Sequence, residues 1–584
     1  MIVPDQNTRW FVAPRKPEAE TLARETGCPP LTAHILQQRG IETASEIMAY
    51  LHPSYDHLAD PALLPDADLA VRRLRKALEQ EEIIYIHGDY DSDGITSAAL
   101  WTRLLEMLGG RVLTHVPHRL RDGYDVRSGF IETARTAGAA LIVTADCGSQ
   151  RHEEAAAAAR SGIDVLITDH HEVGRTLPKA VAVVNPQRAD SKYPFRHLSG
   201  VGVSFRLLEL LVRDLALPVG KYRDAFVELA AIGTITDVMP LLGENRVIAK
   251  AGLSAMGSTR RRGLRALMRV AGLADAKPVA SSDIGFMIGP RINAIGRIDE
   301  PSKALELLLT RDDATAQALA VELDQANRDR REQEAAILAD AIRLIEDAHS
   351  HPTPCIVLAA PGWHRGIIGI VASRLVERYY RPTALISTDP ETGIGRGSCR
   401  SIPCFNIHEA LLECSDYLIE FGGHAHAAGF SIAADAIPSF REALNKAAME
   451  RLNPEDLVPS VAIDAEIALA DLDRQLLQTF ADMEPFGHGN DEPRLGTFGV
   501  PVRSSRRIGK DGAHLRLELG SRSDPPTSAV MWHRGDWADR ISPNSRIDLC
   551  YHIRPDHYRG PERIQLRLLA VRPAADHPRK ELSR

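Results

Sequence analysis

The chain lacks the features that mark several specialised protein classes. Its 584 residues include seven cysteines, an odd number without a Cys-x-x-Cys pair, which excludes a disulfide framework and argues against a zinc ribbon. No apolar stretch approaches the roughly 18 residues that a membrane helix needs, and the first residues lack the basic-then-apolar pattern of a secretory signal. We therefore expect a soluble, reduced, cytoplasmic protein.

An excess of positive charge is also absent. Lys and Arg number 70 and Asp and Glu number 78, which gives a net charge of -8. This balance excludes a uniformly basic coat for nucleic acid, but it leaves room for a basic groove because a sum hides the distribution of charge. The hydrophobic fraction of 44% is ordinary for globular proteins, and the length predicts about three to five domains.

The pattern of apolar residues predicts a mixed architecture. Short apolar strands alternate with helices from about residue 70 to residue 186, which is typical of a parallel sheet covered by helices on both faces. Residues 311–349 have helical spacing without Gly or Pro and predict a connector helix. A second α/β block follows it, and short strands after about residue 456 predict a small β-barrel or sandwich.

Aspartate and histidine cluster where four of these segments end. They are His87, Asp89, Asp91 and Asp93 in IIYIHGDYDSDG, Asp146 in LIVTADCGS, Asp169, His170 and His171 in VLITDHHEVG, and Asp237 after the helical AAIGTIT. Ligands of open parallel sheets bind at the carboxyl ends of the strands, so we expect the clusters to converge. Carboxylates crowded there repel one another, and a pair of Mg²⁺ or Mn²⁺ ions bridged by a shared carboxylate would offset that charge.

Each cluster taken alone has a simpler interpretation. A single aspartate after a strand, such as Asp146 or Asp237, is commonly a helix N-cap, and a His-His pair is more often structural than a ligand. The run DYDSDG begins like a calcium-binding loop, although Leu100 stands at the twelfth position where such a loop has Glu. The four clusters together favour the metal site.

The motifs DYDSDG, ADCGS, TDHHEVG and TDVMP resemble those of the DHH phosphoesterase superfamily, named for the run Asp169-His170-His171. Within that superfamily, further segments are similar to the bacterial RecJ family of single-stranded-DNA-specific exonucleases: GPRINAIGR, WHRGIIGIVASRL, GRGSCRS, FGGHAHAAGF and MEPFGHGNDEP. The resemblance implies an α/β fold with a DHH-type parallel-sheet domain and a smaller DHHA1-type α/β domain joined by a long helix, plus a C-terminal OB-like β-barrel. The domains we expect are an N-terminal helical segment (1–64), a DHH catalytic domain (65–310), the connector helix (311–350), a DHHA1 substrate-binding domain (351–455), an OB-like single-strand-binding domain (456–575) and a disordered tail (576–584).

The resemblance also implies two bound ions, Mn²⁺ or Mg²⁺. It implies that Asp91 binds one ion, that Asp93 binds the other and that Asp146 bridges both. His170 and Asp237 would complete the shell, and His171 would lie close to the scissile phosphate. Asp89 is expected as a ligand or as a partner of one, and His87 stands where only some relatives have a metal-binding histidine.

A glycine-rich segment predicts a substrate contact. GIGRGSCRS places Arg396, Ser398 and Arg400 among glycines, and such a loop lets backbone N–H groups and guanidinium groups bind an anion, although a plain turn is the alternative. The resemblance implies that Ser398 and Arg400, with Arg119, hold a terminal 5′-phosphate. The other substrate-binding residues we expect are Arg291, Asn293, His364, Gly422, Gly423 and His424.

The expected activity is 5′→3′ exonuclease action on single-stranded DNA, in recombination and repair, with 5′-mononucleotides as products. The implied partners besides DNA are a RecQ-type helicase and a single-stranded-DNA-binding protein. A phosphoesterase for small substrates and a non-catalytic DNA-binding protein remain as alternatives. Aromatic residues interleaved with arginines in the terminal domain favour strand binding, unless they are core residues of the barrel: Trp532, Trp537, Tyr551 and Tyr558.

Overall fold

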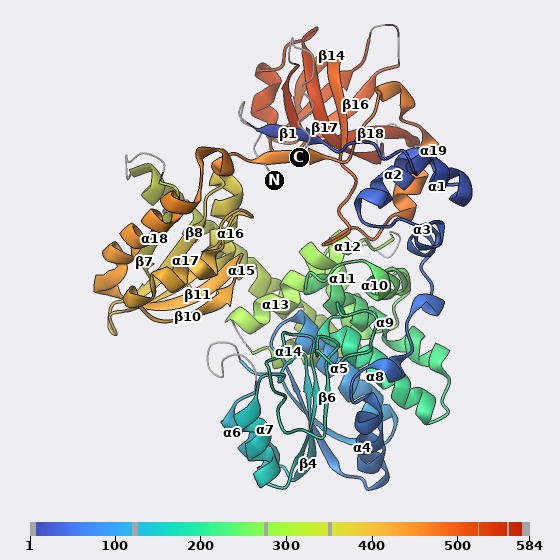
Figure 1. Ribbon diagram of the computed structural model, residues 1–584, viewed down its shortest axis with the longest axis vertical. Helices are drawn as coiled ribbons and strands as arrows, with labels where there is room; N and C mark the ends of the chain where they lie inside the picture. The colour runs from blue at the N-terminus through green and yellow to red at the C-terminus, as the bar shows by residue number, and fades with distance from the viewer. Residues whose placement is uncertain are drawn as a thin grey trace. The chain divides into compact units, whose positions relative to one another are not determined.

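The computed structural model describes residues 8–118, 126–273, 278–298, 300–347, 353–521, 523, 525–556 and 560–574 (Figure 1). It divides into two compact units. Unit 1 comprises Met1–Ile47, Arg330–Asp482 and Glu492–Arg584, and unit 2 comprises Met48–Asp329 and Met483–Asp491. Within the described ranges, no helix is long and apolar enough to cross a membrane. Arg119 and the tail 576–584, for which we made predictions, lie outside the described residues.

Unit 2 contains the predicted parallel sheet. Its five strands run in the order β3-β2-β4-β5-β6, and all neighbours are parallel. They are β2 (Ile83–Gly88), β3 (Arg111–His115), β4 (Ala139–Ala145), β5 (Asp164–Thr168) and β6 (Ala182–Val184). The central strands are buried along most of their length because helices cover both faces, as their continuous apolar runs predict.

Two layers of helices cover this sheet (Figure 1). One face packs against α6 (Ser128–Thr136) and α7 (His152–Arg160) through a core around Phe130 and Ile142. The other face packs against a larger core around Trp101 and Phe205. The helices of that side are α4 (Ala67–Glu79), α5 (Ser92–Met107), α8 (Gly200–Asp214), α9 (Val219–Thr236), α10 (Gly243–Met256), α11 (Arg262–Val270), α12 (Ser281–Asp283), the π-helix η3 (Ile284–Ile288), α13 (Gly289–Ile298) and α14 (Ser302–Leu309).

The predicted connector is a single helix, α15 (Asp313–Asp347), which begins in unit 2 and ends in unit 1. Unit 1 then continues with a five-stranded mixed sheet in the order β10-β11-β9-β8-β7. Its strands are β7 (Ile356–Pro361), β8 (Thr383–Asp389), β9 (Ile394–Arg400), β10 (Leu418–His424) and β11 (Ala427–Ala433), and its helices are α16 (Ile368–Tyr379), α17 (Ile407–Glu413) and α18 (Ile437–Arg451).

The glycine-rich segment is not a loop, and that prediction is wrong. Residues Ile394–Arg400 form β9, which pairs with β8 on one side and β11 on the other. Its glycines make room for side chains of the neighbouring strands. A Cβ at Gly397 would lie 2.1 Å from the Phe430 ring, and one at Gly395 would lie 2.8 Å from a methyl group of Ile386. Because both edges of β9 are paired, its backbone cannot form the anion-binding loop that we expected.

The C-terminal part of unit 1 is a closed five-stranded barrel, as predicted. Its strands pair in the order β14-β15-β16-β18-β17, and β17 pairs back to β14. They are β14 (Leu495–Ile508), β15 (His514–Leu519), β16 (Thr527–Met531), β17 (Arg546–Asp556) and β18 (Gly560–Pro573). Tyr551 is fully buried and its hydroxyl lies 2.8 Å from that of Thr497, so this residue follows the alternative of a core aromatic and does not stack on DNA. Trp532 is 43% exposed, and Tyr558 lies outside the described residues.

The N-terminal segment is not entirely helical. Besides α1 (Ala19–Thr26), α2 (Pro30–Gln38) and α3 (Ala44–Leu51), it contains β1 (Arg9–Val12). Strand β1 pairs in parallel with β12 (Ser460–Ile463), which precedes the short β13 (Ala465–Glu466) and α19 (Arg474–Asp482). The first described strand is thus paired with a strand that precedes the barrel in sequence.

Candidate metal centre

Three aspartates lie side by side where β2, β4 and β5 end. The backbone N–H of Asp89 donates to the Ala145 carbonyl, that of Asp146 to the Thr168 carbonyl and that of Asp169 to the Val184 carbonyl. The sheet's hydrogen bonding therefore continues past the strands and fixes the residue that follows each one. This arrangement confirms that the clusters after the strands meet at one edge of the sheet.

Helix N-termini hold two further aspartates. Asp91 is the N-cap of α5, and its Oδ1 accepts hydrogen bonds from the backbone N–H groups of Asp93 (2.9 Å) and Gly94 (3.0 Å). The carboxylate of Asp93 accepts from the N–H groups of Gly200 (2.7 Å) and Val201 (2.9 Å), at the start of α8. The positive ends of two helices thus stabilise negative charge at this edge.

Asp146 and Asp237 are not N-caps, which removes the simpler interpretation of both residues. Asp146 has a left-handed backbone with φ of 70°, and Asp237 is the residue after the last turn of α9. A Cβ at Gly200 would lie 2.3 Å from Asp146 Oδ1, so only glycine fits where α8 approaches this carboxylate. Sequence reasoning missed this role of Gly200.

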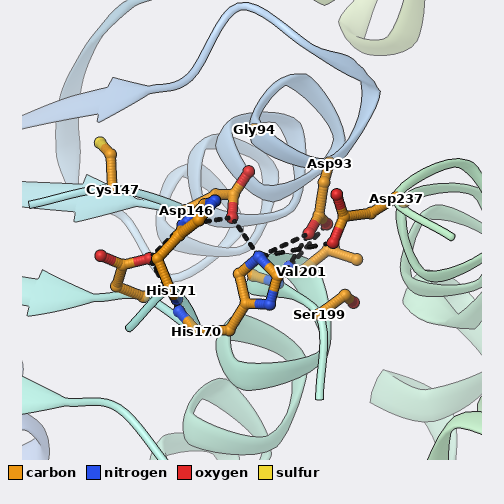
Figure 2. A network of polar contacts seen from close by, with 12 residues as sticks. Asp93, Gly94, Asp146, Cys147, His170, His171, Ser199, Val201 and Asp237 are labelled. Atoms are coloured by element: carbon orange, nitrogen blue, oxygen red, sulfur yellow. Dashed lines mark hydrogen bonds and ion pairs between the residues drawn. The ribbon is translucent and has the colours of Figure 1, made fainter. Parts of the chain in front are cut away.

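The imidazole of His170 lies at the meeting point of the carboxylates, between Asp146 on one side and Asp93 and Asp237 on the other (Figure 2). Its Nε2 is 3.2 Å from Asp146 Oδ1, 3.4 Å from Asp237 Oδ2 and 4.0 Å from Asp93 Oδ2. The possible ligands form three overlapping groups, and within each group the ligand atoms lie within 4.8 Å of one another. The groups are Asp93 with His170 and Asp237, Asp89 with Asp91 and Asp146, and Asp146 with His170 and His171. Shared members connect the groups, as two neighbouring cations would require.

Burial makes this concentration of charge unfavourable without a counter-ion. Burial, together with the charges of neighbouring aspartates, raises the pKa of Asp237 to about 9 and that of Asp93 to about 7. The same causes raise the pKa of Asp146 well above its ordinary value. Burial and the nearby His171 lower the pKa of His170 to about 4, so its imidazole is neutral and can offer a lone pair.

The atoms at the centre fit divalent cations. Asp146 Oδ1 and His170 Nε2 are buried, and neither makes a hydrogen bond with any described residue. Buried polar atoms are nearly always satisfied, so these two unpaired atoms are suited to a bound ligand. Carboxylate oxygens with an imidazole nitrogen are the donor set that Mn²⁺ and Mg²⁺ accept in proteins.

Asp169 and His171 form a pair at the rim of the centre. Asp169 accepts hydrogen bonds from the backbone N–H groups of Ser149, His170 and His171, and its Oδ1 lies 2.8 Å from His171 Nδ1. Burial acts to lower the pKa of His171, but the hydrogen bond and charge of Asp169 outweigh it and raise the pKa to about 9. His171 is 43% exposed, so a cationic imidazole faces the solvent beside the carboxylates.

His87 lies outside the three groups of possible ligands. Its ring is buried, with the Phe130 ring centroid 4.1 Å away, and its Nδ1 lies 3.2 Å from His115 Nδ1. Burial and the charge of His115 lower the pKa of His87 to about 3.

Two residues expected to bind substrate are used inside unit 2. Arg291 is buried, and its guanidinium donates to Asp324 of α15 (3.0 Å) and to the Met287 carbonyl (2.6 Å). Asn293 Oδ1 accepts from the backbone N–H (2.7 Å) and the hydroxyl (2.8 Å) of Ser92, between Asp91 and Asp93. Arg291 thus forms a buried ion pair, and its contact with substrate stays a prediction. Asn293 holds the start of α5, a role that sequence reasoning missed.

In unit 1, Ser398 and Arg400 lie together on β9, beside the first turn of α16. The Arg400 guanidinium donates to the Ser398 hydroxyl (3.3 Å), and a Cβ at Gly369 would lie 2.8 Å from that hydroxyl oxygen. Both side chains are partly exposed. His364 precedes this helix, and its Nδ1 accepts from the Gly366 N–H (3.2 Å). An anion placed here would meet a cation, a hydroxyl and the N–H groups of a helix start.

The remaining predicted residues of unit 1 are less suited to substrate. Arg396 pairs with Glu420 and with the Ser431 hydroxyl, so its charge is already compensated. A Cβ at Gly422 would meet nothing within 4 Å, whereas one at Gly423 would meet the Ala427 carbonyl at 2.5 Å. Glycine at 423 is thus required by the pairing of β10 with β11, and the substrate contacts of Gly422 and Gly423 stay predictions. His424 is exposed at the end of β10.

Comparison with known proteins identifies the family. Three family models match: the DHH family N-terminal domain at residues 83–234, the DHHA1 domain at 353–450 and the RecJ OB domain at 463–570. The single-stranded-DNA-specific exonuclease RecJ of Dickeya dadantii is 36% identical over 575 residues, which cover 94% of this chain and 97% of that protein. The chain belongs to the RecJ family.

Two further RecJ proteins extend this comparison. The exonuclease RecJ of Bacillus subtilis is 35% identical over 559 residues, which cover 96% of this chain and 70% of that protein. The crystal structure of RecJ in complex with Mn²⁺ from Thermus thermophilus matches with a TM-score of 0.83 and 31% identity, covering 98% of this chain and 80% of that one. The RecJ fold thus extends over nearly the whole chain.

Proposed function

We propose that this chain is a metal-dependent exonuclease specific for single-stranded DNA, which degrades strands from the 5′ end and releases 5′-mononucleotides. The observation that carries the proposal is the meeting of the Asp89–Asp91–Asp146 and Asp93–His170–Asp237 groups at one edge of the sheet. RecJ proteins at 33–36% identity bear the name single-stranded-DNA-specific exonuclease, and one RecJ structure contains Mn²⁺.

The proposed centre would hold two ions, Mn²⁺ or Mg²⁺, through Asp89, Asp91, Asp93, Asp146, His170 and Asp237. Bound cations of this kind lower the pKa of water and neutralise charge on a phosphodiester. The chain's own part is to keep the ligands in place: N–H groups of α5 and α8 hold Asp91 and Asp93, and the left-handed turn presents Asp146. No covalent nucleophile is needed for this hydrolysis.

His171 would stabilise the phosphate during the reaction. Asp169 orients its ring and keeps it protonated, so the side chain offers a cation beside the ligands. Ser398 and Arg400 would bind the terminal 5′-phosphate, aided by Arg119. A strand held by its end releases a product of constant length, which would account for exonuclease action.

The terminal barrel favours long strands over the small substrates of an alternative phosphoesterase. Closed barrels of this type bind single strands through exposed aromatic and basic side chains, and Trp532 is such a residue. We further propose a cytoplasmic role in DNA recombination and repair, with a RecQ-type helicase and a single-stranded-DNA-binding protein as partners. Co-purification with each purified partner would test that part.

The decisive experiment presents strands labelled at the 5′ or the 3′ end, as single strands and as duplexes, with Mn²⁺ or with EDTA. We expect a labelled mononucleotide as the first product from the 5′-labelled single strand, and none from blunt duplex or in EDTA. Hydrolysis limited to dinucleotides would favour the small-substrate alternative. Strand binding without any hydrolysis would favour the non-catalytic alternative.

A further inference from the structure

One loop of the chain leaves the barrel domain and packs in the unit that contains the metal centre. Met483–Asp491 lies in sequence between α19 and β14 of unit 1, yet it belongs to unit 2. The proposed function assigns no role to this loop. We name it the insert loop.

Buried polar side chains fasten the insert loop to unit 2. Asn490 is fully buried; its Nδ2 donates to the carbonyls of Met483 (3.1 Å) and Pro485 (2.8 Å), and its Oδ1 accepts from the Tyr50 hydroxyl (2.6 Å). Arg246 of α10 is 2% exposed and donates to the carbonyls of Tyr50, Met483 and Glu484. An arginine enclosed in this way is costly to bury unless its hydrogen bonds are made, so the loop has a defined position.

The insert loop contacts the turn that carries Asp237. The backbone N–H of Leu241 donates to the His488 carbonyl at 2.8 Å. Two glycines of the loop allow this approach: a Cβ at Gly489 would lie 3.0 Å from Pro240, and one at Gly487 would lie 2.7 Å from Leu241. The loop therefore packs directly on the segment that follows Asp237.

The Asp237 turn needs such support. Val238, directly after the aspartate, has a φ of 57°, and a β-branched residue in the left-handed region is strained. Strain of this kind persists only where the surroundings fix the backbone. Two hydrogen bonds from outside α9 hold the segment after Val238: that of the Leu241 N–H to the His488 carbonyl, and that of Asn245 Nδ2 to the Pro240 carbonyl (3.1 Å).

The insert loop also contacts the start of α12. The Ser281 hydroxyl donates to the Phe486 carbonyl at 2.5 Å, at the start of α12. The chain continues from α12 through η3 into α13, where Asn293 holds Ser92 between Asp91 and Asp93. The insert loop thus contacts two of the segments on which the proposed ligands depend.

We infer that the insert loop is a positioning element of the metal centre, which sets the place of Asp237 through the His488 carbonyl and is itself held by Asn490, Tyr50 and Arg246. The inference rests on the proposed metal-binding function, because it assigns Asp237 to a cation. It means that a segment bounded by the barrel domain completes the centre of unit 2. Removal of these anchoring side chains should therefore weaken metal binding while the protein still folds.

The test uses Mn²⁺ alone and the full chain. Asn490→Ala removes three hydrogen bonds of the loop, and Tyr50→Phe removes the tyrosine hydroxyl while keeping the ring beside Arg246. We expect calorimetric titration to show about tenfold weaker Mn²⁺ binding at one site of each variant, which is the scale for residues that support metal ligands. Single-strand binding in EDTA should be unchanged.

The matched control is Tyr222→Phe. Tyr222 is as buried as Tyr50, and its hydroxyl also donates to a backbone carbonyl of unit 2, that of Phe205 at 2.7 Å. This variant should lower the melting temperature yet bind Mn²⁺ like the wild type. Wild-type affinity in folded Tyr50→Phe protein, or equal weakening in Tyr222→Phe, would overturn the inference. Because no DNA is present, the result is separate from whether the chain degrades single strands.

Discussion

The metal centre of unit 2 and strand β9 of unit 1 differ in how the charges of their side chains are compensated. Asp93, Asp146 and His170 are at most 9% exposed, and Asp146 Oδ1 and His170 Nε2 have no hydrogen-bond partner among the described residues. Ser398 and Arg400 are partly exposed and bond to each other. The like charges of the first region must be neutralised by retained protons or by bound cations, whereas in the second region an arginine and a hydroxyl already bond to each other. We therefore predict that hydrolysis depends on unit 2 and that binding of the strand end depends on unit 1.

The largest expected effect comes from the shared carboxylate. Asp146→Ala should reduce Mn²⁺-dependent degradation of a 5′-labelled single strand by roughly 10³-fold or more, because it removes the residue common to two groups of ligands. Single-strand binding in EDTA should be retained. Degradation at the wild-type rate by this variant would refute the proposed metal site and, with it, the contrast drawn between the two regions.

A change on β9 should act on the strand end. Arg400→Ala should weaken the preference for a 5′-phosphate over a 5′-hydroxyl strand by roughly 10–100-fold, the scale of one or two charged hydrogen bonds. Mn²⁺ affinity should stay the same. Arg396→Ala is the control on the same strand, and its effect should be small because Glu420 already compensates this arginine. Competition between the two strand types measures the preference.

Within the barrel, the exposed and the buried aromatic residue should differ. Trp532→Ala should weaken equilibrium binding of a long single strand by at least about fivefold, since stacking on one base contributes about 1–3 kcal/mol. Tyr551→Phe should leave binding unchanged and lower the melting temperature slightly, because its hydroxyl bonds to Thr497 within the core. Equal binding by both variants would show that the strand does not use this face.

The smallest effect is a pH dependence of the metal-free protein. Asp237 and Asp93 have pKa values of about 9 and about 7 in the fold and an ordinary value of 3.8. Between pH 4 and 9 the folded chain therefore retains protons that the unfolded chain releases, so stability falls as pH rises. Melting in EDTA should shift down by a few degrees over this range. Mn²⁺ should reverse the trend, and Asp237→Asn should flatten it in EDTA.

The metal centre was predictable because its signal is local. Aspartates that directly follow apolar strands lie at the carboxyl edge of a parallel sheet, and the structure brings Asp89, Asp146 and Asp169 together there. Their roles as ligands stay a prediction. The long helix and the closed barrel were predictable for the same reason, since each follows from the spacing of apolar residues within one continuous segment.

The errors arose where the answer depends on a distant partner. The glycines of β9 predicted a loop because the residue that requires one of them is distant in sequence: the ring of Phe430 lies beside Gly397. The burial of Tyr551 also depends on segments that sequence periodicity does not connect. Short-range patterns fix the element and its ends, while tertiary packing decides what a side chain finally contacts.

The pairing of β1 with β12 has a consequence for synthesis of the protein. Arg9–Val12 finds its partner only in Ser460–Ile463. At a ribosomal rate of about 5–20 residues per second, roughly 450 residues of translation leave β1 waiting for about 20–90 seconds. Throughout that interval the nascent chain carries Trp10 and Phe11 without their strand partner.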